Sequence, residues 1–161
     1  MSVLVVEAAD DRATAALSRA LAGALVARPA GAVVALNGPL GAGKTRFVRE
    51  LAAALGVNPD EVASPTFVLL HEYAGVRPIF HCDAYRLRSA RELWELGVEE
   101  MFDSEAIVLI EWADRVADAL PADYLEVRIE VIGDTSRRFT LRAIGASYEG
   151  VIDALRIGNS H

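Results

Sequence analysis

The apolar residues along the chain predict strands and helices that alternate over most of its length. Residues 32–37 and 106–112 are largely apolar and of strand length, which is typical of strands buried on both faces of a sheet. Residues 11–27 repeat apolar side chains every three or four positions, which predicts a helix that Asp10 and Asp11 can cap. We therefore expect a buried sheet covered by helices.

Turn residues between the apolar segments predict the remaining elements. Strands are expected at residues 2–7, 66–73, 78–83, 124–132 and 137–144, and helices at 44–55, 89–96, after residue 112 and over the tail 147–157. The last two strands flank Gly133-Asp134, which is a hairpin signal. Ser89 and Glu92 have the spacing of a capping box at a helix start, and Gly56 and Gly97 mark helix ends.

The length and composition fit one folded domain over residues 1–161. The chain is 53% hydrophobic with a mean hydropathy of +0.27, so it can bury a sizeable core. No linker or repeat divides it, and only the tail after about residue 147 fits no distinctive pattern. No apolar run reaches the roughly 18 residues of a membrane span, so we expect no membrane partner.

One basic residue of the chain differs in type from all the others. Among 16 basic residues, Lys44 is the only lysine. The formal net charge of −7 disfavours direct binding to nucleic acid, which proteins grip through dense Lys and Arg contacts. A single cysteine, Cys82, cannot form an internal disulfide, which fits the reducing cytoplasm.

The lone lysine lies in a glycine-rich segment between a predicted strand and a predicted helix. This segment fits the pattern G-x-x-x-x-G-K-[ST] of a P-loop, with the residues Gly38, Pro39, Leu40, Gly41, Ala42, Gly43, Lys44 and Thr45. Backbone N–H groups of such a loop surround phosphates, the lysine reaches the β- and γ-phosphates, and the threonine hydroxyl binds Mg²⁺.

Two acidic residues end predicted strands in the same way as the P-loop strand ends in its loop. Asp83 and Glu111 each follow an apolar run, and the carboxyl ends of parallel strands meet at one edge of a sheet. With Thr45 they form the predicted metal site. The sequence leaves open which carboxylate binds Mg²⁺ and which orients the attacking water.

Two further residues are candidates for the nucleotide site. Thr66, in the segment Ser64-Pro65-Thr66-Phe67, can sense γ-phosphate and metal, as threonines of P-loop switches do. Trp112 follows Glu111 directly and can stack near the nucleotide. Proteins that select guanine usually carry a lysine-containing motif, and a chain without a second lysine cannot have one, so ATP is favoured over GTP.

Together these patterns predict an α/β fold, a three-layer sandwich like that of P-loop NTPases. Strands that alternate with helices favour a parallel centre, and the C-terminal hairpin adds antiparallel strands, so the sheet should be mixed.

Several short segments in order resemble the TsaE (YjeE) family of P-loop ATPases. Besides the P-loop and residues 64–67, these are His81-Cys82-Asp83-Ala84-Tyr85-Arg86-Leu87, Glu95-Leu96-Gly97 and Ile110-Glu111-Trp112. The resemblance covers nearly the whole chain, to about residue 145.

The resemblance implies an ATPase that supports the TsaB–TsaD complex, which transfers a threonylcarbamoyl group to adenosine 37 of ANN-decoding tRNAs (t6A). It implies that the chain reaches tRNA only through these partners. It assigns nucleotide and metal binding to Lys44 and Thr45, functional carboxylates to Asp83 and Glu111, and a place near the nucleotide to Thr14 in the first helix. Thr66 would belong to a switch-like loop and Trp112 would neighbour the carboxylates.

Two alternatives stay open from the sequence. A small P-loop kinase acting on a metabolite would need an arginine-bearing lid, and residues 86–91 are the nearest candidate. A nucleotide-dependent binding module would use the same loop without essential hydrolysis.

Overall fold

The computed structural model describes residues 2–62 and 69–159 of the chain. Within them, seven strands form one sheet in the order β1-β7-β6-β2-β5-β4-β3. The strands are β1 (Val3–Ala8), β2 (Ala32–Asn37), β3 (Leu70–Ala74), β4 (Pro78–Asp83), β5 (Ile107–Glu111), β6 (Tyr124–Val131) and β7 (Arg137–Ile144). The α-helices are α1 (Asp11–Val26), α2 (Lys44–Ala54), α3 (Ala90–Glu95), α4 (Val98–Phe102) and α5 (Glu149–Asn159). Short 3₁₀ helices are η1 (Pro59–Glu61), η2 (Ala113–Ala119) and η3 (Ala146–Tyr148).

The sheet is mixed, with a parallel centre, as the sequence predicts. Strand β2 is parallel to both β5 and β6, and β4 is parallel to β5. The predicted C-terminal hairpin is confirmed, because β6 and β7 pair antiparallel, and β3 and β1 add antiparallel pairs at the two edges.

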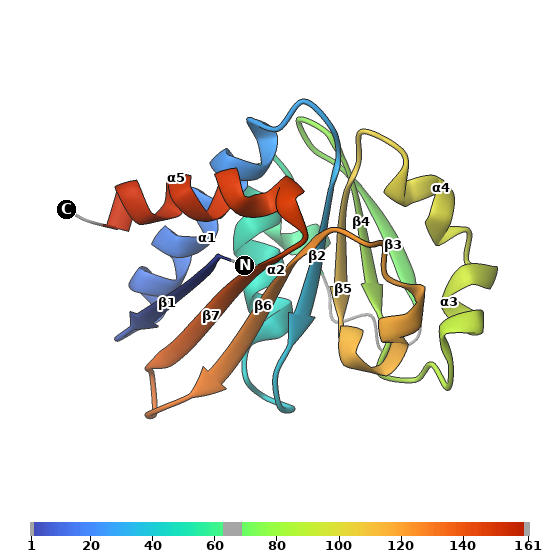
Figure 1. Cartoon of the computed structure of the whole chain (residues 1–161). Helices are drawn as coiled ribbons and strands as arrows, with labels where there is room; N and C mark the ends of the chain where they lie inside the picture. The colour runs from blue at the N-terminus through green and yellow to red at the C-terminus, as the bar shows by residue number, and fades with distance from the viewer. Residues whose placement is uncertain (1, 63–68, 160–161) are drawn as a thin grey trace.

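Helices cover both faces of the sheet and make three layers (Figure 1). Along β2, Val34 and Leu36 belong to the core under α1, α2 and α5, whereas Val33 and Ala35 belong to the core under α3, α4 and η2. Side chains of a strand alternate between its faces, so a strand buried on both sides must be apolar throughout. The continuous apolar run at residues 32–37 thus follows from the position of β2 in the middle of the sheet.

Local sequence signals determine where α1 begins and where α2 ends. Asp10 caps α1, since the N–H of Ala13 donates to its carboxylate at 2.9 Å. Gly56 has a φ of 94° just after α2, and the N–H of Val57 bonds back to the carbonyl of Ala52 at 3.0 Å. This is a Schellman ending, for which glycine is favoured because it adopts positive φ without strain.

Other local expectations differ from the structure. Ser89 precedes α3, but its side chain makes no capping hydrogen bond, and Glu92 accepts from the N–H of Arg88 instead. The prediction of a capping box is therefore wrong. The helix expected after residue 112 is the 3₁₀ helix η2, interrupted at Val116, where φ is −130°. Helix α4 was not expected, because its five residues are too few to show a helical period.

Two predicted elements have different bounds in the structure. Strand β3 begins at Leu70, and the part of the predicted strand that falls in residues 63–68 lies outside the described residues. The tail forms α5, whose Val151, Ile152 and Leu155 join the core beside α1. No helix among the described residues combines the length and the apolar character that crossing a bilayer requires.

Candidate nucleotide-binding site

The glycine-rich segment forms the connection between β2 and α2, with Gly38, Gly41 and Gly43 all at positive φ. A Cβ atom on Gly38 would lie 2.6 Å from the carbonyl oxygen of Ile129 on β6, so the loop packs directly on the neighbouring strand. Gly43 precedes α2 and has no side chain with which to cap it. The first N–H groups of α2 are therefore free of a side-chain cap, which is the usual arrangement where a helix start binds an anion.

Lys44 is buried at the start of α2, with only 5% of its surface exposed. Its ammonium donates to the carbonyls of Gly38 at 2.6 Å and Pro39 at 2.9 Å, and lies 3.9 Å from the centre of the Trp112 ring. Burial lowers the pKa of this ammonium, and the nearby carboxylate of Glu111 opposes the shift. The lysine is thus held inside the loop by neutral backbone carbonyls, which a charged phosphate can replace.

The two predicted acids lie side by side at the carboxyl edge of the sheet. Glu111 on β5 is paired in register with Asp83 on β4, and on its other side with Leu36 at the end of β2. Burial raises the pKa of the Asp83 carboxyl, and the charge of Glu111 adds to this effect. The N–H of Tyr85 donates to Asp83 at 2.9 Å and opposes it.

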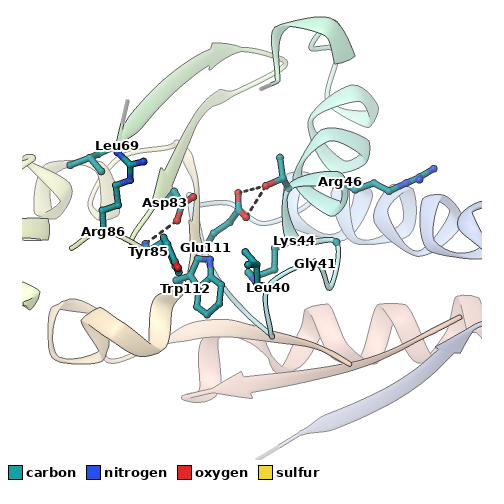
Figure 2. Close-up of a pocket in the computed structure, with 12 residues that line it drawn as sticks. Leu40, Gly41, Lys44, Arg46, Leu69, Asp83, Tyr85, Arg86, Glu111 and Trp112 are labelled. Carbon is teal, nitrogen blue, oxygen red and sulfur yellow. Dashed lines mark hydrogen bonds between the residues drawn. The ribbon is translucent and has the colours of Figure 1, made fainter. Parts of the chain in front are cut away.

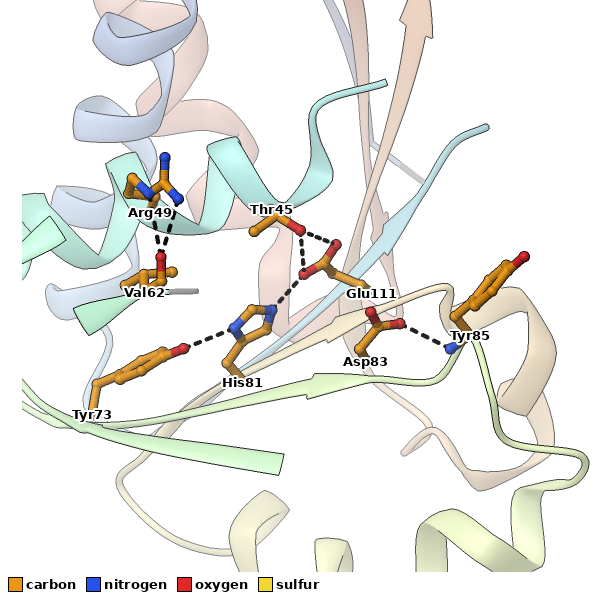
Figure 3. Close-up of polar contacts among 8 residues, drawn as sticks. All are labelled: Thr45, Arg49, Val62, Tyr73, His81, Asp83, Tyr85 and Glu111. Carbon is orange, nitrogen blue, oxygen red and sulfur yellow. Dashed lines mark hydrogen bonds and ion pairs between the residues drawn. The ribbon is translucent and has the colours of Figure 1, made fainter. Parts of the chain in front are cut away.

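Glu111 connects the acidic edge to the P-loop helix (Figure 3). The hydroxyl of Thr45 donates to its carboxylate, at 3.0 Å from Oε1 and 3.2 Å from Oε2. Asp83 has no bond to Thr45 among the described residues. The hydroxyl and carboxylate oxygens are hard donors of the kind that Mg²⁺ binds, usually together with phosphate oxygens.

Sequence reasoning missed a histidine and a tyrosine that extend this group. The Nε2 atom of His81 lies 2.5 Å from Oε2 of Glu111, and the hydroxyl of Tyr73 lies 3.1 Å from Nδ1 of His81. A signal was present, because His81 lies two positions before Asp83 on the same strand and therefore points to the same face.

A cavity of about 370 Å³ joins the loop and the acidic edge (Figure 2). Its walls are Leu40, Gly41, Gly43, Lys44, Thr45, Arg46, Leu69, Asp83, Tyr85, Arg86, Glu111 and Trp112. The Trp112 ring forms part of the wall at 5.0 Å from the ring of Tyr85. Trp112 is also the one non-glycine residue at positive φ within the described ranges, at 57°, and such conformations concentrate at functional sites.

The structure thus brings eight of the expected residues into one cavity: Leu40, Gly41, Gly43, Lys44, Thr45, Asp83, Glu111 and Trp112. Thr14 is buried in α1 and does not line this cavity. Thr66 lies outside the described residues. The expected roles of these two threonines stay predictions.

Three features define a P-loop protein of the nucleotide-binding class. They are a glycine loop between a central parallel strand and a helix, a buried lysine within that loop, and an acid on the adjacent strand. The family model for "Threonylcarbamoyl adenosine biosynthesis protein TsaE" matches residues 8–139. The chain belongs to the TsaE family, which acts in the biosynthesis of tRNA threonylcarbamoyladenosine.

Relatives and a solved structure agree with this assignment. The chain is 40% identical over 133 residues to the tRNA threonylcarbamoyladenosine biosynthesis protein TsaE of Bacillus subtilis, covering 82% of each chain. It is 40% identical over 111 residues to the TsaE protein of Treponema pallidum, covering 69% of this chain and 82% of that one. The crystal structure of Bacillus subtilis YdiB superposes with a TM-score of 0.80 at 31% identity and covers 98% of this chain and 97% of its own.

Proposed function

We propose that this protein binds Mg-ATP at the P-loop and hydrolyses it in support of a TsaB–TsaD complex that makes t6A at adenosine 37 of ANN-decoding tRNAs. The observation that carries the proposal is the contact between Thr45 and Glu111, which joins the P-loop helix to the acidic edge beside the buried Lys44. Membership of a family that acts in tRNA modification supports the pathway. A cytoplasmic location, where tRNA is modified, is part of the proposal.

The loop residues bind and orient the phosphates. The uncapped N–H groups at the start of α2 would bind the phosphates, and the ammonium of Lys44 would exchange the carbonyls of Gly38 and Pro39 for the β- and γ-phosphates. Burial lowers the pKa of the Lys44 ammonium, and the charges of Glu111 and Asp83 oppose this shift.

The two carboxylates divide the remaining work. Glu111 would hold the metal together with Thr45, because only this carboxylate contacts the threonine hydroxyl among the described residues. Asp83 lies on the next strand and orients the attacking water, for which its half-buried position in the cavity wall is suited. Mg²⁺ held there would supply positive charge that neutralises the charge developing on the phosphate oxygens.

The acidic surface supports a role through partners. With a net charge of −7 the protein is a poor ligand for tRNA itself, so TsaD-like and TsaB-like proteins would hold the RNA. We expect hydrolysis to be slow for the isolated protein, since switch-like P-loop sites often need a partner to complete them.

The first test replaces Lys44 by Ala, with the exposed Arg19→Ala as a control that removes the same charge elsewhere. Titration with a fluorescent ATP analogue should show no binding for Lys44→Ala and wild-type binding for Arg19→Ala. Equal affinity of both variants would refute the nucleotide site.

The second test separates the two acids. Glu111→Gln should bind nucleotide in EDTA as the wild type does but lose its response to Mg²⁺, whereas Asp83→Asn should keep that response and lose turnover by about 100-fold or more, equivalent to a few kcal/mol of barrier. A reversed pattern would exchange the two roles. Normal repeated t6A synthesis by Glu111→Gln with purified TsaB and TsaD would show that hydrolysis is not the function.

A further inference from the structure

Two buried side chains continue from the Glu111 carboxylate into the core, and the proposed chemistry does not use them. His81 on β4 is fully buried, and Tyr73 on β3 is 4% exposed. Figure 3 shows them in line with Glu111, so that three strands contribute one row of hydrogen-bonded groups that ends at Thr45.

The partners of the imidazole define its proton position. A carboxylate only accepts hydrogen bonds, so the Nε2 atom of His81 donates to Oε2 of Glu111 at 2.5 Å. The other ring nitrogen, Nδ1, lies 3.1 Å from the hydroxyl of Tyr73, which can donate to it when Nδ1 carries no proton. With a proton on Nε2 and none on Nδ1, every polar atom in this row has a hydrogen-bond partner, as buried groups require.

The row also fixes the orientation of the carboxylate. Oε2 of Glu111 bonds to His81, while Oε1 faces the Thr45 hydroxyl at 3.0 Å. Once a metal binds, the Thr45 hydroxyl would bind the metal and would no longer hold the carboxylate. The bond to His81 would then be the contact that prevents the carboxylate from rotating. The ring of His81 is itself packed beside the ring of Tyr73, with centres 6.0 Å apart.

We propose that His81 is a positioning residue that holds Oε2 of Glu111 so that Oε1 is presented to the nucleotide-bound Mg²⁺, and that Tyr73 fixes the tautomer and orientation of His81. The inference rests on the proposed function, since it concerns how the same site binds its metal. Groups that hold the ligands of a metal typically change its affinity or the activity by about 10–100-fold when they are removed.

Two substitutions of His81 form a matched pair. In His81→Gln the amide nitrogen can take the place of Nε2 and donate to Glu111. In His81→Asn the shorter amide reaches only the place of Nδ1, so it keeps the Tyr73 bond and loses the bond to Glu111. Both remove the aromatic ring, so the loss of packing is shared.

The measurement is a Mg²⁺ titration of nucleotide affinity and of turnover on the full chain. We expect His81→Asn to need about 10–100-fold more Mg²⁺, His81→Gln to stay within about threefold of the wild type, and Tyr73→Phe to shift the requirement by about 2–10-fold. Nucleotide affinity in EDTA should be unchanged in all three, because His81 and Tyr73 do not line the cavity.

The outcomes separate this inference from the proposed function. Absence of Mg²⁺-dependent nucleotide binding in the wild type would refute both, whereas wild-type Mg²⁺ dependence in His81→Asn, or equal losses in the Asn and Gln variants, would refute only the positioning role. NMR of wild-type protein with ¹⁵N-labelled histidine does not depend on any variant folding. A proton on Nε2 of His81 would support the proposal, and a neutral ring with its proton on Nδ1 would overturn it.

Discussion

The hydroxyl of Tyr148 supports the strand that leads into the P-loop. Tyr148, 3% exposed, closes η3, and its oxygen accepts a hydrogen bond from the backbone N–H of Val33 at 2.8 Å. Its ring lies 3.9 Å from the guanidinium of Arg28, a contact that phenylalanine can also make. Tyr148→Phe therefore removes one acceptor and preserves the packing.

The expected cost follows from the N–H group that loses its partner. A buried donor without an acceptor costs about 1–3 kcal/mol, and the lower end applies if water enters from the shallow cavity beside Val33 and Tyr148. With a slope of about 2 kcal/mol per molar urea, the unfolding midpoint should fall by about 0.5–1.5 M.

Urea unfolding followed by circular dichroism measures this change. Tyr124→Phe is the matched control, since the Tyr124 hydroxyl has no hydrogen bond within the described part of the chain and its loss should alter stability by less than about 0.5 kcal/mol. Nucleotide affinity should be unchanged, because Val33 lies at the end of β2 away from the loop. Equal urea midpoints for Tyr148→Phe and Tyr124→Phe would refute the assigned role of the hydroxyl.

Three further predictions follow from the loop, a helix cap and the buried thiol. Gly38→Ala, which places a Cβ 2.6 Å from the Ile129 carbonyl at a φ of 156°, should weaken nucleotide binding by at least about tenfold in a fluorescence titration. The control Gly23→Ala adds a Cβ in open space within α1 and should raise the free energy of unfolding by about 0.5–1 kcal/mol. Asp10→Ala removes the cap of α1 and should cost about 1 kcal/mol in urea unfolding. Burial raises the pKa of Cys82 to about 12, so iodoacetamide should label it at pH 8.5 only when the chain unfolds.

The raised pKa of Cys82 also predicts how the stability of the fold depends on pH. The thiol ionises near pH 8.5 in the unfolded chain and only near pH 12 in the fold, so its contribution to stability is full below about pH 8.5 and is lost as the pH rises. Rapid labelling of native protein, tight binding by Gly38→Ala, or an unchanged urea midpoint in Asp10→Ala would each contradict the corresponding prediction.

Local and periodic signals predicted most of the fold. The apolar run at residues 32–37, the loop after it and the hairpin signal at Gly133-Asp134 are visible in the chain because each depends on neighbouring residues. The same holds for Lys44 and Thr45, whose spacing is fixed by the loop. The convergence of Asp83 and Glu111 required one added rule, that parallel strands end at a common edge.

Features that depend on strand pairing could not be predicted in this way. The bond between His81 and Glu111 depends on the register of β4 against β5, and the contact of His81 with Tyr73 on the register of β3 against β4. No local pattern specifies these registers. Likewise the sequence indicated that a hairpin exists but not that β6 pairs parallel to β2. Glu92 showed the spacing of a capping box, yet the N–H of Arg88 was an available competitor for its carboxylate.

The pairing of β2 with β6 also sets an order on folding. Val34 lies opposite Leu125, and β1 pairs with β7, so the central and edge contacts both join distant parts of the chain. Proteins rich in such non-local contacts fold slowly, and a chain under synthesis forms them late. A nascent chain carries its complete Gly38–Thr45 loop long before it has the strand on which Gly38 packs. Nucleotide binding should therefore begin only after β6 has left the ribosome and paired.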